Sequence, residues 1–334
     1  MRKSYYLFNS GRMSRKDHTL KFTSLDENGI EGPARYIPVE SVDNLYAFGA
    51  LDANSALFNF LGQQQISVHF FDYYEHYTGS FMSRDYLLSG KTLIAQTENY
   101  SNPRKRLVLA SRFVEGAAFN MLRNLRYYNS REKDTSEQIS HIELLMEQIP
   151  VMTAVDMLMG IEGNIRNTYY QAFDIIINDF EMGCRTKRPP SNEVNALCSF
   201  INMMCYTLCL DMIHHTQLNP TISYLHQPGA RRYSLALDLA EIFKPLLSDR
   251  LVFALLNKRI IGKSDFDYQL NSCLLKDGGR KKVVRAWDER LSETIQHRSL
   301  KRKVSYRHLV RLECYKLVKH ILGMEDYKPF KAWW

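Results

Sequence analysis

The 334-residue sequence lacks several patterns that would assign a function at once. Its six cysteines include no CxxC pair, which argues against a zinc ribbon or a redox dithiol and favours reduced cysteines in the core. No phosphate-binding glycine loop occurs, so hydrolysis of a nucleoside triphosphate is disfavoured. No uninterrupted apolar run reaches about 18 residues, and the N-terminus has no apolar segment of signal-peptide length. We therefore expect a cytoplasmic protein with no membrane segment.

Basic residues, in contrast, are abundant and spread along the whole chain. The sequence has 44 Lys and Arg against 36 Asp and Glu, a formal net charge of +8. This balance indicates an acidic polymer such as nucleic acid as a partner. Arg185, Lys187 and Arg188 precede a diproline, and a second basic cluster runs from Arg280 to Lys319. Phosphate contacts need such Lys and Arg density, although a solvated helix face is the alternative for each cluster.

The first part of the chain, residues 1–85, has the pattern of a small β domain. Short apolar and aromatic runs alternate there with turn residues such as NSGR and DENG. The predicted strands cover residues 5–8, 19–22, 35–39, 44–48 and 66–73. One helix is predicted over residues 51–64, because Leu57, Phe60 and Leu61 follow a helical spacing.

The remainder, residues 86–334, has the periodicity of helices. Predicted helices cover residues 107–128, 139–149, 164–180, 193–214 and 234–257. A connector near residues 78–93 marks the boundary, and a chain of this length exceeds the usual size of one core. We therefore predict an α+β protein, with a small β-rich N-terminal domain followed by a larger all-α C-terminal domain.

Three carboxylates interrupt segments that would otherwise read as buried helix. Asp238 and Glu241 are three positions apart, so they share a face of the helix over 234–257. They form either a solvated stripe or a ligand pair, because burying unpaired carboxylates costs several kcal/mol. Glu162 lies between Gly160 and Gly163, which would allow a tight turn and the approach of a ligand. It is either a ligand or a charge at the start of a helix.

One histidine completes a possible site. His226 lies on a predicted loop that leads into the helix for which Ser234 is a plausible N-cap. Alone it indicates a packing or surface role, but with the three carboxylates it gives the ligands of a divalent cation for phosphodiester chemistry. Arg231 and Arg232 could hold a phosphate beside it. One imidazole among carboxylates favours Mn²⁺, with Mg²⁺ as the second choice.

The order of Glu162, His226 and then Asp238 and Glu241 in the run DLAE resembles the CRISPR-associated adaptation integrases, the family called Cas one, and in particular the version of subtype I-B. The resemblance covers essentially the whole chain. The matching segments are YYLFNSGRMSRKDHTL, NLYAFGALDANSALFNFL, MGIEGNIRNTYY, RPPSNEVNALCSF, LNPTISYLHQPGARRYSLALDLAEIFKPLLSDR and SYRHLVRLECYKLVKHILGMEDYKPFKAWW.

The resemblance implies the roles of the site residues. Glu162, His226 and Glu241 match the family's metal ligands, for Mn²⁺ or Mg²⁺, and Asp238 matches an adjacent acid with a supporting part in catalysis. Some relatives have Asp where this chain has Glu241, and the carboxylate is kept. Arg185, Arg188, Arg231 and Arg232 are the candidates for contacts with nucleic acid.

The resemblance also implies an activity and an assembly. The family is a metal-dependent DNA endonuclease and integrase, which inserts short pieces of invader DNA into the CRISPR array when a 3′-hydroxyl attacks a phosphodiester. The N-terminal domain would dimerise and contact the partner. Two homodimers would clamp a dimer of the small protein Cas two in a heterohexamer. The alternative is a noncatalytic basic scaffold for nucleic acid, in which the four polar residues form structural ion pairs with nearby arginines.

Overall fold

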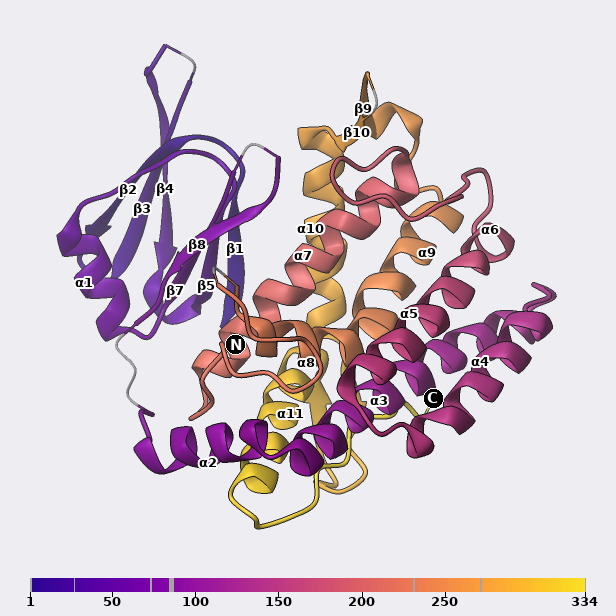
Figure 1. Cartoon of the computed structure of the whole chain (residues 1–334). Helices are drawn as coiled ribbons and strands as arrows, with labels where there is room; N and C mark the ends of the chain where they lie inside the picture. Colours follow the sequence, from indigo (N-terminus) through magenta and orange to yellow (C-terminus); the bar gives the residue numbers. More distant parts are fainter. Residues whose placement is uncertain are drawn as a thin grey trace. The chain divides into compact units, whose positions relative to one another are not determined.

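The computed structural model describes residues 2–26, 28–72, 74–83, 87–230, 232–270 and 272–333. The chain divides into two compact units, Met1–Tyr86 and Leu87–Trp334, one residue after the predicted boundary (Figure 1). Strands dominate the first unit and helices the second, which is the mixed α+β class that the sequence predicts. All six cysteines are free, and only Cys184 is exposed.

The N-terminal unit consists of two four-stranded sheets and one helix. The first sheet has the order β1 (Lys3–Leu7), β5 (Val42–Ala47), β7 (Ser67–Phe71) and β8 (Tyr77–Phe81), in which only β8 is antiparallel to its neighbour. The second has the order β4 (Glu31–Pro38), β3 (Thr19–Leu25), β2 (Gly11–Lys16) and β6 (Leu51–Asp52). A 3₁₀ turn (Val39–Ser41) precedes β5, and helix α1 (Ser55–Gln63) follows β6. Leu20, Leu45 and Leu57 contribute to one core shared by both sheets and α1.

Three strands of this unit were not predicted, and the helix begins later than predicted because β6 occupies the first residues of the segment 51–64. In β2 only Met13 is a large apolar residue facing the core, so the strand shows no apolar alternation. β8 lies within the predicted connector except for its first residue, Tyr77, and none of its residues is fully buried. Helix α1 begins at Ser55 because the Asn54 side chain accepts from the backbone N–H of Leu57 at 3.0 Å. Tyr73, the last residue of a predicted strand, lies outside the described residues.

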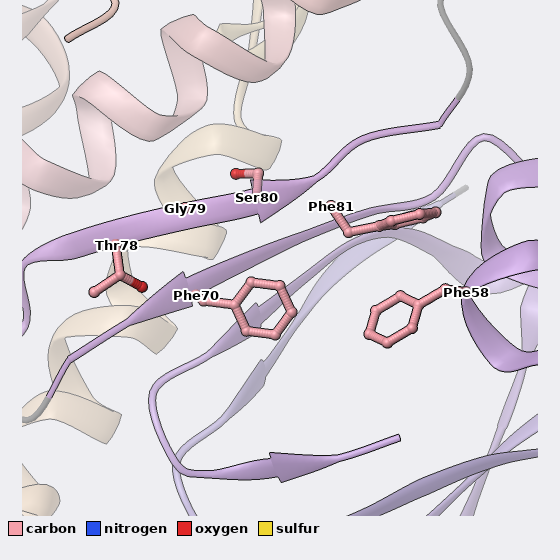
Figure 2. A pocket seen from close by; sticks show the side chains of 6 residues that line it. All are labelled: Phe58, Phe70, Thr78, Gly79, Ser80 and Phe81. Carbon is pink, nitrogen blue, oxygen red and sulfur yellow. The ribbon is translucent and has the colours of Figure 1, made fainter. Parts of the chain in front are cut away.

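A shallow hollow of about 440 Å³ lies against the first sheet (Figure 2). Phe58 of α1, Phe70 of β7 and Phe81 of β8 line it together with residues 78–80. None of these side chains is ionisable. The hollow therefore supplies no general acid, general base or metal ligand for phosphodiester chemistry.

The C-terminal unit is a bundle of helices. Its α-helices are α2 (Gly90–Ser101), α3 (Pro103–Asn129), α4 (Ser136–Gln148), α5 (Val155–Gln171), α6 (Phe173–Ile176), α7 (Glu193–His214), α8 (Ser234–Lys244), α9 (Arg250–Asn257), α10 (Asp277–Ser292) and α11 (Tyr306–Ile321). Short 3₁₀ turns occupy Ile149–Val151 and Lys263–Asp265. Helix α3 packs against α4, α5 and α8, and α7 packs against α8 and α11.

Helix α7 is the apolar core helix of this unit. Its length and its mean hydropathy of 1.6 would allow it to cross a membrane, but 78% of the apolar window is buried inside the unit. The prediction for residues 193–214 is confirmed at both ends. Asn192 begins the helix by accepting from the backbone N–H of Asn195 at 2.9 Å.

The prediction of an all-α C-terminal part is wrong in one respect. Two antiparallel hairpins occur, formed by β9 (Phe266–Gln269) with β10 (Ser272–Leu275) and by β11 (Thr294–Gln296) with β12 (Lys303–Ser305). In the first hairpin Phe266, Cys273 and Leu275 are buried while Asp267 and Tyr268 are exposed. Strands of three or four residues are too short for a period of two to be recognised in the sequence.

A π-helical turn interrupts the helix predicted over residues 234–257. It spans Pro245–Asp249 between α8 and α9 and begins at a proline, which has no backbone N–H for a helical hydrogen bond. Two asparagines of α3, one turn apart, bond to carbonyl groups here: Asn120 Nδ2 donates to Ile242 O at 2.9 Å and Asn124 Nδ2 to Pro245 O at 2.7 Å. These bonds fix α8 against α3 next to Glu241.

Candidate functional site

Glu162 lies in the middle of α5, not at the start of a helix as predicted. Helix α5 begins at Val155 and includes Gly160 and Gly163, and a Cβ at either glycine would meet nothing within 4 Å. Neither glycine makes a turn, and the space beside both is open. The reading of Glu162 as a helix-start charge is therefore excluded.

Asp238 and Glu241 are both buried in α8, so a solvated stripe is excluded as well. Their exposed fractions are 0% and 5%. The sequence predicts Ser234 as the N-cap, but in the structure Ser234 is the first residue of the helix and Tyr233 is at the N-cap position. The hydroxyl of Ser234 instead donates to Thr221 O at 2.8 Å, which ties the start of α8 to the preceding loop.

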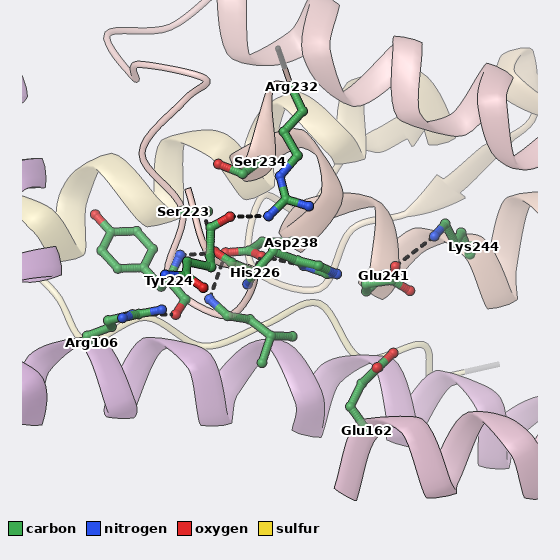
Figure 3. Close-up of polar contacts among 12 residues, drawn as sticks. Arg106, Glu162, Ser223, Tyr224, His226, Arg232, Ser234, Asp238, Glu241 and Lys244 are labelled. Atoms are coloured by element: carbon green, nitrogen blue, oxygen red, sulfur yellow. Dashed lines mark hydrogen bonds and ion pairs between the residues drawn. The ribbon is translucent and has the colours of Figure 1, made fainter. Parts of the chain in front are cut away.

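Asp238 organises the loop that carries His226 (Figure 3). Its Oδ2 accepts from the backbone N–H groups of Tyr224 at 2.7 Å and Leu225 at 3.0 Å. Its Oδ1 accepts from the backbone N–H of His226 at 2.9 Å and from the imidazole Nδ1 at 2.8 Å. Because Nδ1 donates to the carboxylate, the neutral ring has its lone pair on Nε2, the atom that a metal or a proton can take.

Helices α2 and α3 brace the same loop from the other side. Gln96 Nε2 donates to the carbonyl groups of Asn219 and Ile222, both at 2.9 Å. Arg106 Nε donates to Tyr224 O at 3.0 Å. The loop is thus held at several backbone positions, and the orientation of the imidazole is set before any ligand arrives.

Glu162 and Glu241 share a cation. Arg166, one turn after Glu162 on α5, donates from Nε to Glu162 Oε1 at 2.8 Å, and its Nη2 contacts both Glu162 Oε1 and Glu241 Oε2. Lys244 Nζ lies 2.7 Å from Glu241 Oε1. Figure 3 shows the two carboxylates opposite each other on α5 and α8, with His226 close to them. All four charged side chains are largely buried.

The charges in this cluster shift each other's pKa values. Burial alone would raise the pKa of Glu241, but Arg166, Lys244 and His226 hold it down at about 2. Burial alone would lower the pKa of His226, but Asp238, followed by Glu241 and Glu162, raises it above its ordinary value. Because both glutamates contribute to the raised pKa of His226, the imidazole lies close enough to interact with their charges.

A second set of cations adjoins the carboxylates. Burial lowers the pKa of Lys187, and the charges of Lys244, Arg185 and Arg166 lower it further. The loop after Gly183 therefore brings its basic residues near the site. Positive charges that repel one another in this way are stabilised when a phosphate binds among them.

The predicted arginines differ in how far their donors are used. Arg185 donates to Asn195 Oδ1 at 3.0 Å and holds its own loop on α7, whereas Arg188 is exposed. Arg232 is exposed and donates to a carbonyl of the His226 loop. Arg231 lies outside the described residues.

The three predicted metal ligands agree with a divalent cation in chemistry. Two carboxylates and an imidazole Nε2 are a donor set suited to Mn²⁺ or Mg²⁺. Within the described ranges, however, no three His, Cys, Asp or Glu side chains are arranged to hold a metal ion, since Arg166 joins Glu162 to Glu241 instead. The donor set therefore fits a metal, but in this structure the two carboxylates are paired with Arg166 and Lys244.

Sequence reasoning missed Arg166, Lys244 and Asp249. The first two could have been found, because Arg166 is four residues after Glu162 and Lys244 three after Glu241, the spacings at which helical side chains meet. Asp249 has no such signal. It is the last residue of the π-helical turn, where it is buried against the hydroxyl of Tyr169.

The raised pKa of Asp249 predicts that the stability of the protein depends on pH. Burial raises its pKa to about 7, whereas the unfolded chain releases this proton near about pH 4. Between these values the folded state binds more protons than the unfolded state, so the free energy of unfolding falls as the pH rises. Asp249→Asn removes this titration. Its free energy of unfolding, relative to that of wild type, should therefore rise by up to about 4 kcal/mol between about pH 4 and pH 8. Urea unfolding of both proteins across this range measures it, and parallel pH profiles would contradict it.

The chain resembles known proteins over almost its whole length. The family model described as "CRISPR associated protein Cas1" matches residues 5–289. The chain is 49% identical to the CRISPR-associated endonuclease Cas1 3 of Thermodesulfovibrio yellowstonii, across 99% of this chain and 100% of that protein. A solved CAS1 protein from Thermotoga maritima is 37% identical, with a TM-score of 0.85 over 97% of this chain and 99% of that one.

Two more distant structures share the fold. A casposase bound to an integration product has a TM-score of 0.86 at 17% identity, covering 99% of this chain and 93% of that one. A chain of a Cas6-RT-Cas1–Cas2 complex has a TM-score of 0.81 at 17% identity, covering 99% of this chain and 36% of that one. From the family match and the close relatives together, this chain belongs to the Cas1 family.

Proposed function

We propose that this protein is a metal-dependent DNA endonuclease and integrase of CRISPR adaptation, acting in the cytoplasm in a system of subtype I-B. The convergence of Glu162, His226 and Glu241 from α5, the braced loop and α8 carries the proposal. The Thermodesulfovibrio relative, named an endonuclease, supports the cleavage activity. The fold shared with a casposase bound to an integration product agrees with strand transfer.

The proposed reaction joins an incoming strand to the repeat boundary. The 3′-hydroxyl oxygen forms a bond to phosphorus, the bond to the leaving 3′-oxygen breaks, and the proton of the attacking hydroxyl is replaced by one on the leaving oxygen. A divalent cation bound by Glu162, His226 and Glu241 would lower the charge on the nonbridging oxygens, activate the attacking oxygen and stabilise the leaving one. Water in place of the hydroxyl gives hydrolysis.

The chain's own residues prepare the site for this step. Asp238 accepts the Nδ1 proton of His226 in a hydrogen bond, which leaves Nε2 of the neutral ring available to bind the cation. Lys187 and Arg188, with Arg232 on the His226 loop, would bind backbone phosphates, and we propose the same role for Arg231 from its place beside Arg232 in the sequence. Arg185 mainly holds its loop in place, and we propose that its contact with DNA is secondary.

The proposed partners are DNA, a second copy of the chain and Cas two. DNA accords with the net charge of +8 and with the cations around the site. One chain of the solved Cas6-RT-Cas1–Cas2 complex contains this fold, which supports Cas two as the protein partner. We propose a heterohexamer of two homodimers and one Cas two dimer, with the N-terminal unit making the dimer and partner contacts.

A noncatalytic scaffold is the second candidate, and one observation favours it. Glu162 and Glu241 are both neutralised by Arg166 and Lys244, as the scaffold hypothesis predicts for structural ion pairs. A scaffold would bind DNA equally with and without a chelator. It would show no strand chemistry with any metal.

Metal dependence and a histidine variant separate the two functions. We expect Mn²⁺ or Mg²⁺ to be required for cleavage and integration of labelled DNA, and EDTA to stop both reactions. His226→Ala should lower both rates at least about a hundredfold, because a metal supplies several kcal/mol of transition-state stabilisation. His18→Ala, which changes an exposed residue of the N-terminal unit, serves as the control and should have no effect. DNA binding without strand chemistry under any metal would establish the scaffold instead.

A further inference from the structure

Arg166 holds the position between the two glutamates that are the proposed ligands. Its guanidinium contacts Glu162 through Nε and Nη2, and Nη2 also contacts Glu241. Lys244 reaches only Glu241. Arg166 is thus the single side chain, among those described, that links the carboxylate of α5 to that of α8.

The two glutamates and the two cations that contact them carry no net charge without a metal. Two carboxylates, Glu162 and Glu241, face two cations, Arg166 and Lys244. A divalent ion added to this set would leave two uncompensated positive charges in a largely buried place, which is strongly unfavourable. Either a cation must withdraw from the carboxylates or an anion must enter together with the metal.

The helix provides room for Arg166 to withdraw. Side chains on a helix lean toward its N-terminus, so Arg166 lies over the preceding turn, where Gly163 is three residues back. A Cβ at Gly163 would meet nothing within 4 Å, so the space beside it is open. Gly163 makes no turn in α5, so the backbone conformation there does not require a glycine.

We propose that the Arg166 guanidinium occupies the cation position between Glu162 and Glu241 in the metal-free protein, and that a divalent ion binds by exchange with it. Metal affinity then depends on the difference in free energy between the carboxylates paired with Arg166 and the carboxylates bound to the metal ion. This inference rests on the proposed function, because it takes these two glutamates as metal ligands. It assigns to Arg166 a part in metal loading that is separate from any contact with DNA.

Substitution of Arg166 tests the exchange directly. Arg166→Met removes the competing charge and keeps a long side chain, so we expect Mn²⁺ to bind about tenfold more tightly or better, a usual size for coupling between two binding events. Arg166→Lys keeps the charge and should bind Mn²⁺ much less tightly than Arg166→Met. Isothermal titration calorimetry of the full chain without DNA measures all three proteins. Arg126→Met, which breaks the Arg126–Glu143 ion pair between α3 and α4, is the matched control and should leave the affinity unchanged.

The outcomes separate this inference from the proposed function. If Arg166→Met binds Mn²⁺ no more tightly than wild type while Glu162→Ala abolishes binding, the exchange is wrong and the metal site stands. If Glu162→Ala binds Mn²⁺ as wild type does, the proposed ligands themselves are wrong.

A measurement on the wild-type protein keeps the test valid if Arg166→Met fails to fold. The Nε–Hε resonance of Arg166, assigned by its loss in Arg166→Lys, should shift during a Mg²⁺ titration as the hydrogen bond to Glu162 breaks. A resonance that stays unchanged when Mg²⁺ saturates the protein would overturn the exchange.

Discussion

Glu162→Gln is expected to abolish metal-dependent cleavage and strand transfer while the protein remains folded and binds DNA. Glutamine keeps the size of the side chain, and its Oε1 can still accept from Arg166, but the charge that would bind a metal is lost. Arg166 keeps Glu241 as a partner, so no buried cation is left unpaired. Since the metal supplies several kcal/mol of transition-state stabilisation, the rate should fall about a thousandfold or more.

Rates of cleavage and integration at saturating Mn²⁺, together with gel-shift affinity for DNA in EDTA, measure this effect. Glu137→Gln is the control, because Glu137 is an exposed glutamate in the first turn of α4 and should leave both quantities unchanged. Wild-type rates in Glu162→Gln would remove Glu162 from the site. An equal fall in the rates for Glu137→Gln would indicate a general effect of removing one negative charge from the protein.

Asp238→Ala is expected to reduce both activity and stability. It leaves three backbone N–H groups and the imidazole Nδ1 without their acceptor in a buried place. Each unsatisfied group costs about 1–3 kcal/mol, so the free energy of unfolding of the helical unit should fall by roughly 4 kcal/mol or more. The His226 ring loses its orientation as well, and loss of such a supporting carboxylate typically costs about 10- to 100-fold in metal affinity or activity.

If Asp238 positions His226, loss of its carboxylate should also change the pKa of the imidazole. Without the carboxylate, the pKa of His226 should fall, because Asp238 is the largest of the groups that raise it. Titration of the His226 ring by NMR checks this shift. Asp174→Ala is the matched control, since Asp174 is an exposed aspartate that also accepts from backbone N–H groups, those of Met182 and Gly183. The control should change stability but not activity, whereas an unchanged pKa of His226 in Asp238→Ala would contradict the role.

Where the sequence predicted the fold well, a strong local period was present. Helix α7 is apolar over most of its length and begins at the Asn192 cap, so both of its ends were predictable. Helix α5 was predicted to begin too late because Gly160 and Gly163 each cost about 1 kcal/mol relative to Ala in a helix. Packing of α5 against α3 and α4 stabilises the helix through both glycines, and this tertiary contact has no signature in the local sequence.

The candidate site shows the same division. Its residues could be named from the sequence, because Asp238 and Glu241 are polar positions in an apolar helix and His226 precedes them on a loop. The four hydrogen bonds at Asp238 could not, since they depend on the path of the loop in space. The bridge from Arg166 to Glu241 likewise joins two residues that are 75 positions apart in the sequence.

The position of a bound metal tests the central claim most directly. A crystal of the protein soaked in Mn²⁺ locates the ion by its anomalous scattering. We predict one ion bound by carboxylate oxygens of Glu162 and Glu241 and by Nε2 of His226, with Nδ1 of His226 still bonded to Asp238. An ion bound elsewhere, or none at these three side chains while they keep their present ion pairs, would contradict the account.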